Sequence, residues 1–275
     1  MPRSSQSATI AFPPFAGAVR TLVLANVGVF FAIALLQAFA PRAADALLAL
    51  AELQPAMVVH GAIWQLVTYS FVHTGILEIL FAMLTLWFCG SMLEGAYGAR
   101  WLRELYFTSA IAGALLAAAI ALTGILHLSP DDIGHGAWAG VFGLLVAIAL
   151  RMGDTEFLLF FVVRIRAKYM VAIYILFYTA VLLKGGDRFG ALLQLAGGLA
   201  GALYLRFAPR GGLAVGVSER LFGVRNAYYR YKRRRAARKF QVYMGKKGRS
   251  VKFDSDGRYI DPDKKKDPTD KRWMN

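Results

Sequence analysis

The stretch Gly136-Ala-Trp-Ala-Gly-Val-Phe-Gly-Leu-Leu-Val-Ala-Ile-Ala-Leu150 decides how this chain folds. It is apolar throughout, yet its 15 or so residues would reach only about 22 Å as a helix, less than the roughly 30 Å hydrocarbon core of a bilayer. A membrane span this short is best surrounded by protein. Small residues let neighbouring backbones come close, which predicts the central helix of a bundle. They are Gly136, Ala137, Ala139, Gly140 and Gly143.

The rest of the chain is equally apolar. Of its 275 residues 57% are hydrophobic and 18% charged, and the mean hydropathy is +0.47, values typical of membrane proteins. We therefore expect an all-α membrane protein with a six-transmembrane-helix bundle. The fifth span is also short and is expected to be enclosed by protein. The six predicted spans cover residues 21–40, 67–92, 105–126, 136–150, 169–183 and 190–208.

The first span resembles a signal peptide in one respect, because Ala38-Phe39-Ala40 looks like a small-residue cleavage site. Its apolar run is longer than a signal sequence needs, however, and Pro41 follows directly. We interpret it as a membrane anchor.

Lysine and arginine in the short loops predict the orientation of the bundle. The turn 94–104 carries Arg100 and Arg103, and the segment 151–168 carries four more cations, so both are assigned to the cytoplasm. Residues 1–20 are then a cytoplasmic N-terminus, 21–208 the membrane domain and 209–275 a cytoplasmic tail. We expect the inner, or plasma, membrane.

Two segments between the predicted spans are not assigned as membrane spans themselves. Residues 44–53 are either a short interfacial helix or a plain loop. The apolar run 157–163 is too short to cross a bilayer and is assigned to the cytoplasmic interface.

The tail after Phe207 is strongly basic, with 20 Lys and Arg against 7 Asp and Glu from Arg210 onward. Apolar residues at helical spacing predict an amphipathic helix over about 217–239, lying on anionic lipid. Nucleic acid or the ribosome could also bind these positive charges, but no motif of a folded nucleic-acid-binding domain accompanies them. Residues 240–244 and 250–253 could pair as a hairpin, and 261–275 should be disordered. The expected lipid contacts are Arg225, Lys232, Arg233, Arg234 and Arg235.

Chemistry that needs thiols or a late imidazole is excluded. The single cysteine, Cys89, rules out an intramolecular disulfide and a thiolate metal cluster, and no histidine follows His135. His127, Asp131, Asp132 and His135 lack matched spacing for a metal, which favours a solvated loop. We expect no metal and no cofactor.

From Trp64 to Gly201 the sequence resembles the rhomboid family of intramembrane serine proteases. The resemblance rests on Phe71-Val72-His73 and Leu93-Glu94, on the small-residue run Ser109-Ala110-Ile111-Ala112-Gly113, and on the order of three later motifs. These are Gly140-Val141-Phe142-Gly143, Phe160-Phe161-Val162-Val163 and the pair Gly197 and Gly201.

The resemblance implies that the catalytic positions have been replaced. The nucleophile position falls on Trp138, the base on Gln194 (or Leu195), and the two oxyanion-site positions on Glu78 and Ala82. None of these supplies the nucleophile, base or donors that acyl transfer needs. It thus implies a pseudoprotease that binds client transmembrane helices between the second and fifth spans. His73, Glu78, Trp138 and Gln194 would line the client cavity.

Other interpretations of the function are also open at this point. An active protease could use a rebuilt site with His135 or Ser109, and a small transporter or lipid-binding membrane protein would share the composition. Glu78, placed about three turns into the second span, is either a ligand contact or a carboxyl hydrogen-bonded near His73. Trp138 is more often packing than recognition in such a position.

Overall fold

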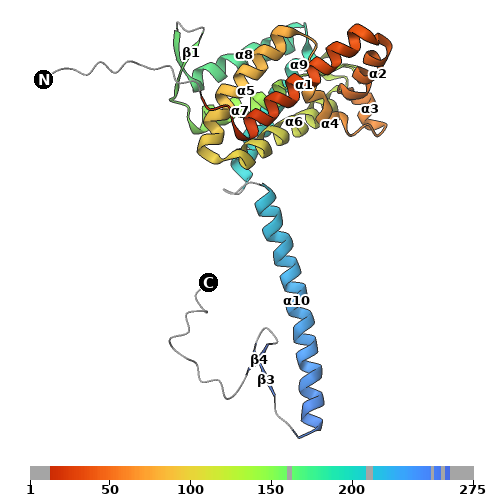
Figure 1. The fold of residues 1–275 in the computed structure, drawn as a ribbon, viewed down its shortest axis with the longest axis vertical. Helices are drawn as coiled ribbons and strands as arrows, with labels where there is room; N and C mark the ends of the chain where they lie inside the picture. Colours follow the sequence, from red (N-terminus) through yellow and green to blue (C-terminus); the bar gives the residue numbers. More distant parts are fainter. Residues whose placement is uncertain (1–12, 160–162, 209–212, 249–250, 255–257, 261–275) are drawn as a thin grey trace, which may run out of the picture. The chain divides into compact units, whose positions relative to one another are not determined.

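A computed structural model describes residues 13–159, 163–208, 213–248, 251–254 and 258–260 (Figure 1). Its contacts divide the chain into two units, Met1–Gly212 and Leu213–Asn275. The first contains the apolar helices and the second the basic tail.

The first unit is a helical bundle. Its elements in chain order are α1 (Gly17–Phe39), α2 (Pro41–Ala51), α3 (Pro55–Val59), α4 (Gln65–Thr68), the 3-10 turn η1 (Tyr69–Phe71), α5 (Ile76–Tyr97), α6 (Ala99–Ala121), the turn η2 (Ile125–His127), α7 (Trp138–Arg151), strands β1 (Glu156–Leu159) and β2 (Val163–Arg166), α8 (Ala167–Lys184) and α9 (Arg188–Phe207). An all-helical membrane architecture is confirmed.

Helices α6, α7 and α9 form the centre of this bundle. A Cβ atom added to Gly113 of α6 would lie 2.7 Å from the Cα of Gly197 in α9, and one on Gly201 of α9 would lie 2.8 Å from the Cα of Gly143 in α7. Real side chains do not approach backbone so closely, so only glycine fits at these crossings. Every residue of α7 from Ala139 to Ile148 is buried, as its small residues predict.

Five helices in the described chain are long and apolar enough to cross a membrane, namely α1, α5, α6, α8 and α9. The fourth predicted span, α7 (Trp138–Arg151), has 14 residues and reaches about 21 Å, so the six-span count is not confirmed. The expectation that the fifth span is enclosed by protein is wrong. Only 11% of the apolar stretch of α8 is buried, against 56% for α9.

The second span begins about nine residues later than predicted. Residues 65–75 do not continue a helix but form α4, η1 and an extended turn. Tyr69 fixes this segment by donating its hydroxyl hydrogen to the carbonyl of Ala110 in α6 at 2.8 Å. The turn ends at Gly75, whose extended backbone precedes the first helical residue, Ile76.

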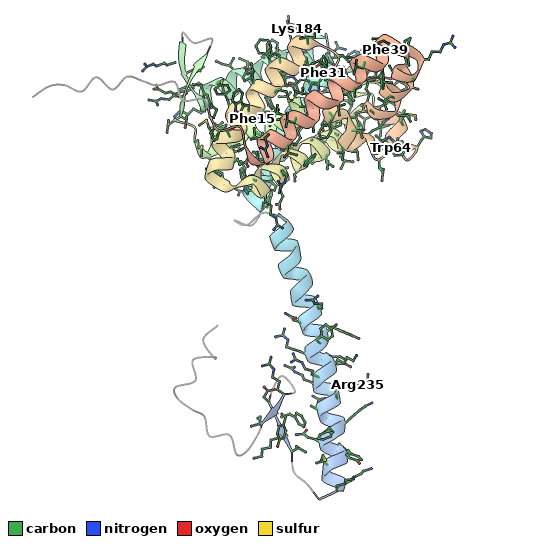
Figure 2. The ribbon with its side chains drawn as sticks, in the orientation of Figure 1. Phe15, Phe31, Phe39, Trp64, Lys184 and Arg235 are labelled. Atoms are coloured by element: carbon green, nitrogen blue, oxygen red, sulfur yellow. The ribbon has the colours of Figure 1, made fainter. Side chains whose placement is uncertain are left out.

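Helix α1 is held to α5 by its N-terminus. The Glu94 carboxylate accepts hydrogen bonds from the backbone N–H groups of Ala18 and Val19, both at 2.9 Å. A carboxylate there satisfies otherwise unpaired donors and complements the positive end of the helix dipole. Farther along, α1 leaves large apolar side chains such as Phe31 and Phe39 exposed (Figure 2). Its packing on α5 agrees with an anchor retained in the protein.

Two connecting segments have defined structure. Most of residues 44–53 belong to helix α2 (Pro41–Ala51), so of the two alternatives expected for this segment the helix is the correct one. The apolar run 157–163 belongs to an antiparallel hairpin in which Glu156 pairs with Arg166 and Leu159 with Val163. Residues 160–162 lie outside the described chain.

The tail unit contains one long helix and one small hairpin. Helix α10 (Leu213–Lys246) includes and extends the predicted helix 217–239. The predicted pairing of 240–244 with 250–253 is wrong, because 240–244 continue α10. Strand β3 (Lys252–Phe253) pairs instead with β4 (Tyr259–Ile260), and the Phe253 ring lies 6.2 Å from that of Phe240. Residues 261–275 lie outside the described chain.

The close contacts between helices at glycine predict that two Gly→Ala substitutions will change the free energy of unfolding differently. Gly113→Ala should lower the free energy of unfolding by about 1–3 kcal/mol, because its methyl group meets the backbone of α9. Gly28→Ala in α1 should be neutral or stabilising by up to about 1 kcal/mol, since nothing lies within 4 Å of its Cβ position. Unfolding with denaturing detergent, followed by circular dichroism, measures both. Equal shifts would contradict a close α6–α9 contact.

Candidate functional site

A cavity of about 260 Å³ lies where α5, α7 and α9 begin. Three of the four side chains predicted to line a client cavity, Glu78, Trp138 and Gln194, line this one together. The other lining residues are Ile133, Gly134, His135, Ala139, Asp187, Gly190 and Leu193. The predicted residues thus meet at one end of the bundle although they are far apart in sequence.

Glu78 is not in the middle of a span. It occupies the first turn of α5, because that helix begins at Ile76. Its Oε2 atom accepts hydrogen bonds from the backbone N–H groups of Thr74 and Gly75 at 3.3 and 3.4 Å. A carboxylate is favourable at a helix N-terminus. The predicted position about three turns into the span is therefore wrong. The carboxyl is hydrogen-bonded, as one of the two alternatives expected, but to backbone N–H groups.

His73 lies behind the cavity wall and is 2% exposed. Its Nε2 atom accepts a hydrogen bond from the backbone N–H of Ala137 at 3.3 Å, so the proton of the neutral ring sits on Nδ1, 3.3 Å from the Phe71 carbonyl. Burial lowers the pKa of His73, although Glu78 nearby opposes this shift. The neutral ring joins the turn before α5 to the start of α7.

His135 and Glu52 extend the polar wall, and sequence reasoning assigned neither to this site. The His135 Nε2 atom lies 3.0 Å from the Thr74 hydroxyl and 4.0 Å from the Glu78 carboxylate, and its Nδ1 lies 3.9 Å from Glu52. Burial raises the pKa of Glu52, and His135 acts in the opposite sense. No local motif signals this cluster, because it forms only when 52, 74, 78 and 135 come together in space.

On the opposite wall, Asp187 and Gln194 belong to the beginning of α9. Asp187 is the N-cap of that helix, and its Oδ1 accepts the backbone N–H of Gly190 at 2.8 Å. An Asp directly before an apolar helical run is typical of a helix N-cap, so the role of Asp187 could have been predicted from the sequence. The carbonyl oxygen of the Gln194 side chain is buried and has no hydrogen-bond partner within the described residues.

The remaining predicted positions lie elsewhere. Ala82 is fully buried on α5 and does not line the cavity. Ser109 is fully buried on α6 beside Gly143, and its hydroxyl finds no hydrogen-bond partner in the described chain. A serine nucleophile requires an adjacent base. Ser109 has no such base beside it among the described residues. The His135 imidazole contacts a hydroxyl, but it is that of Thr74 and not of a serine.

Among the residues that the structure describes, no three His, Cys, Asp or Glu side chains gather closely enough to hold a metal ion. His127 and Asp132 line a separate, polar surface cavity near Arg188. The geometry of the described loop therefore offers no metal site built from 127–135.

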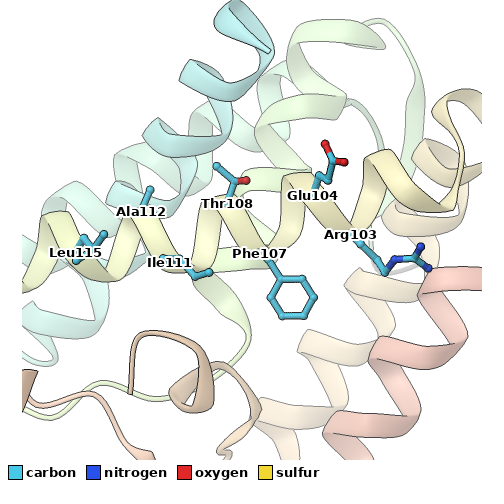
Figure 3. Close-up of a pocket in the computed structure, with 7 residues that line it drawn as sticks. All are labelled: Arg103, Glu104, Phe107, Thr108, Ile111, Ala112 and Leu115. Carbon is cyan, nitrogen blue, oxygen red and sulfur yellow. The ribbon is translucent and has the colours of Figure 1, made fainter. Parts of the chain in front are cut away.

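A second hollow runs along the outer face of α6 (Figure 3). Its volume is about 590 Å³, and every lining side chain comes from this one helix. Arg103 and Glu104 stand at one end, followed by Phe107, Ile111 and Leu115. Because one helix supplies all of its walls, this is an open face toward the surroundings of the bundle rather than an enclosed site.

In the tail, all five residues expected to contact lipid lie exposed on α10. Figure 2 shows Arg235 on this helix. Successive residues of a helix are rotated by about 100°, so the four cations 232–235 point all around its axis. The positive charge is not confined to one face, unlike that of the expected amphipathic helix.

Comparison with known proteins places the bundle in a family. The sequence model of a family described as eukaryotic integral membrane protein (DUF1751) matches residues 21–217, well over half of the chain. No curated protein matches the chain. The match covers all the membrane helices and ends just inside α10.

This finding corrects the predicted rhomboid membership, because nothing specific to rhomboids accompanies the match. The small residues that carried the resemblance have a general explanation. Gly113, Gly143, Gly197 and Gly201 lie where α6, α7 and α9 touch, and any tightly packed membrane bundle needs small residues there. Without membership of the rhomboid family, there is no basis for interpreting four positions as former catalytic ones, namely Trp138, Gln194, Glu78 and Ala82.

The His73 contact predicts a pH dependence of stability. Since its pKa in the folded protein is below the ordinary 6.5, the unfolded chain binds the proton first as the pH falls, and the free energy of unfolding should decrease from about pH 7.5 toward pH 5.5. His73→Gln keeps an uncharged acceptor for Ala137 and should flatten this decrease. Thermal unfolding in detergent at several pH values measures it, with the exposed His60→Gln as control. An unchanged slope in His73→Gln would contradict the assignment.

Proposed function

Because this chain belongs to the eukaryotic integral membrane protein family DUF1751, we propose that it is a non-catalytic, polytopic membrane protein that binds the transmembrane helices of other membrane proteins. Membership and the five membrane-length helices establish the polytopic membrane protein. The binding of client helices is the proposed step. The observation that carries it is the open apolar surface where α5 and α8 flank α7.

Helices α5 and α8 both pack against α7 and have little contact with each other. Each presents a row of large exposed side chains. On α5 these are Leu77, Leu80, Phe81 and Leu84, and on α8 they are Ile173, Leu176 and Phe177. Van der Waals packing drives the association of helices in lipid, so a client helix can lie along this surface in place of acyl chains.

The client would lie on this surface and not enter the cavity. One turn of a helix, about 10 Å wide with a pitch of 5.4 Å, occupies about 400 Å³ even as a smooth cylinder. The cavity holds about 260 Å³. Glu78, Trp138 and Gln194 can therefore reach a client only at the rim of the cavity.

Absence of catalysis is part of the proposal. Its support is that Ser109 lies fully buried and that its hydroxyl has no hydrogen-bond partner, and hence no base, among the described residues. A rebuilt serine protease would need a nucleophile and base in contact.

The proposal also includes an orientation. With α7 counted as a sixth span, the cations of 94–104 and 151–168 support a cytoplasmic side for both termini, and the plasma membrane remains the proposed location. The tail would then meet the inner leaflet, where each Lys or Arg near anionic lipid contributes about 1 kcal/mol. Like charges four residues apart, such as Arg230 and Arg234, repel, and anionic lipid would relieve this repulsion.

Site-specific photo-crosslinking tests the client surface. A photoreactive amino acid at Leu80 or Phe177 should give adducts with transmembrane peptides of other membrane proteins, several-fold more than at Leu24 or Phe31 on α1. All four positions are exposed and apolar, so lipid contact alone would label them equally.

Two outcomes separate the alternatives. Adducts with lipid only, or equal protein yields on α1, would remove the support for client binding. Labelling of the purified protein by a serine-directed fluorophosphonate together with cleavage of a transmembrane substrate would instead establish a protease, and solute movement into proteoliposomes a transporter.

The tail contact is tested in proteoliposomes. With Asn226→Cys labelled by an environment-sensitive maleimide, while Cys89 stays buried and unlabelled, emission should shift to the blue in anionic but not neutral vesicles. Replacing Arg233, Arg234 and Arg235 by Gln should abolish most of the shift, and so should salt of about 1 M, which shortens the Debye length to about 3 Å. Replacing Lys246, Lys247 and Lys252 is the matched control. A shift insensitive to the arginines would refute this contact.

A further inference from the structure

We propose that the cavity at the start of α5, α7 and α9 binds the ammonium group of a small organic cation. Hydrogen-bond acceptors from two opposite walls, together with an indole ring, line this cavity. This inference goes beyond the binding of client helices, since it concerns a small ligand at a different place.

The acceptors come from helices that are far apart in sequence. On one side, all described hydrogen bonds of Glu78 use Oε2, which leaves Oε1 available. On the other side, Asp187 uses Oδ1 to cap α9. The buried side-chain oxygen of Gln194 has no partner among the described residues. A buried acceptor without a partner is costly, and the positive charge of a bound ammonium group beside it would offset part of this cost.

Trp138 adds a favourable surface for a cation. Its indole lines the same cavity as the two carboxylates. A sphere of about 260 Å³ is about 8 Å across, so an ammonium group near its centre would be about 4 Å from the wall, within the roughly 6 Å over which an aromatic ring attracts a cation. Tryptophan is the strongest of the aromatic residues in this role.

The charges around the cavity have the sign that a cation needs. None of the ten described residues that line it is Lys or Arg. Arg188 lines a neighbouring cavity, to which Asp187 also contributes. Among these described lining residues, His135 is the one that could carry positive charge, and even when it is protonated the lining carboxylates of Glu78 and Asp187 outnumber it.

Size and ligand geometry favour an organic cation over a metal ion. The volume equals that of about nine water molecules at about 30 Å³ each, far more than a bare ion requires. It is slightly below the usual range for drug-sized ligands. Moreover, the described residues contain no group of three His, Cys, Asp or Glu placed for a metal.

Two kinds of molecule could supply the ammonium group that binds here. One is the ethanolamine or choline headgroup of a phospholipid, because the cavity lies at the end of membrane helices, where headgroups are found. The other is a soluble amine of similar size.

Calorimetric titration of the purified full-length protein in an uncharged detergent tests the proposal. Tetramethylammonium chloride should bind, whereas sodium chloride at the same ionic strength should not. Glu78→Gln and Asp187→Asn should each weaken this binding about tenfold, because each removes a charge and keeps the hydrogen bonds at its helix start. Glu156→Gln, an exposed carboxylate on β1, should leave it unchanged.

Two further arms identify the source. Binding of free choline or ethanolamine without lipid supports a soluble amine. Retention of phosphatidylethanolamine or phosphatidylcholine over phosphatidylglycerol in native mass spectra, lost in Asp187→Asn, supports a headgroup.

The proposal is overturned if tetramethylammonium binds no better than sodium, or binds equally to both charge-removing variants and the wild type. Crosslinking at Leu80 and Phe177 does not depend on these variants, so the two proposals fail separately.

Discussion

The backbone contact among α6, α7 and α9 is the constraint on which the structure depends. Where Gly113 meets Gly197 and Gly143 meets Gly201, the helices are closer than any side chain allows. Inside a bilayer no hydrophobic effect draws helices together, so close packing has to supply the stabilisation. This contact fixes the start of α7 relative to α9 and thereby brings Trp138 and Gln194 to one cavity.

Much of this fold could be predicted from composition and periodicity. Six apolar stretches correspond to six helices, and the enclosed α7 follows from its length and small residues. The start of α5 was placed too early, because the predicted span was extended back over 67–75, which is more polar than the helix it precedes and contains Ser70, His73 and Thr74. It is the tertiary hydrogen bond from Tyr69 to Ala110 and the turn at Gly75 that break the helix there. The exposed position of α8 was missed for a related reason, since length does not tell which neighbours a helix will have.

The candidate site was predicted only in part. Glu78, Trp138 and Gln194 do converge, although the family resemblance that selected them is not supported. Glycines common to all closely packed bundles produced the resemblance. Asp187 could have been recognised as a helix N-cap, whereas His135 and Glu52 carry no sequence motif. The positions of all three around the site depend on the fold. The nine-residue shift in α5 also changes the chemistry, because it turns an apparent mid-membrane carboxyl into a helix-capping one.

The shortness of α8 has a consequence for the surrounding lipid. Its 18 residues reach about 27 Å, below a hydrocarbon thickness of about 30 Å, and only 11% of its apolar stretch is buried, whereas α5 and α6, with 22 and 23 residues, match or exceed that thickness. Mismatch of this kind is accommodated by thinning the bilayer locally, at a cost for each ångström. The protein should therefore partition into the thinner of two membranes, and bilayer thickness becomes a factor in where it accumulates.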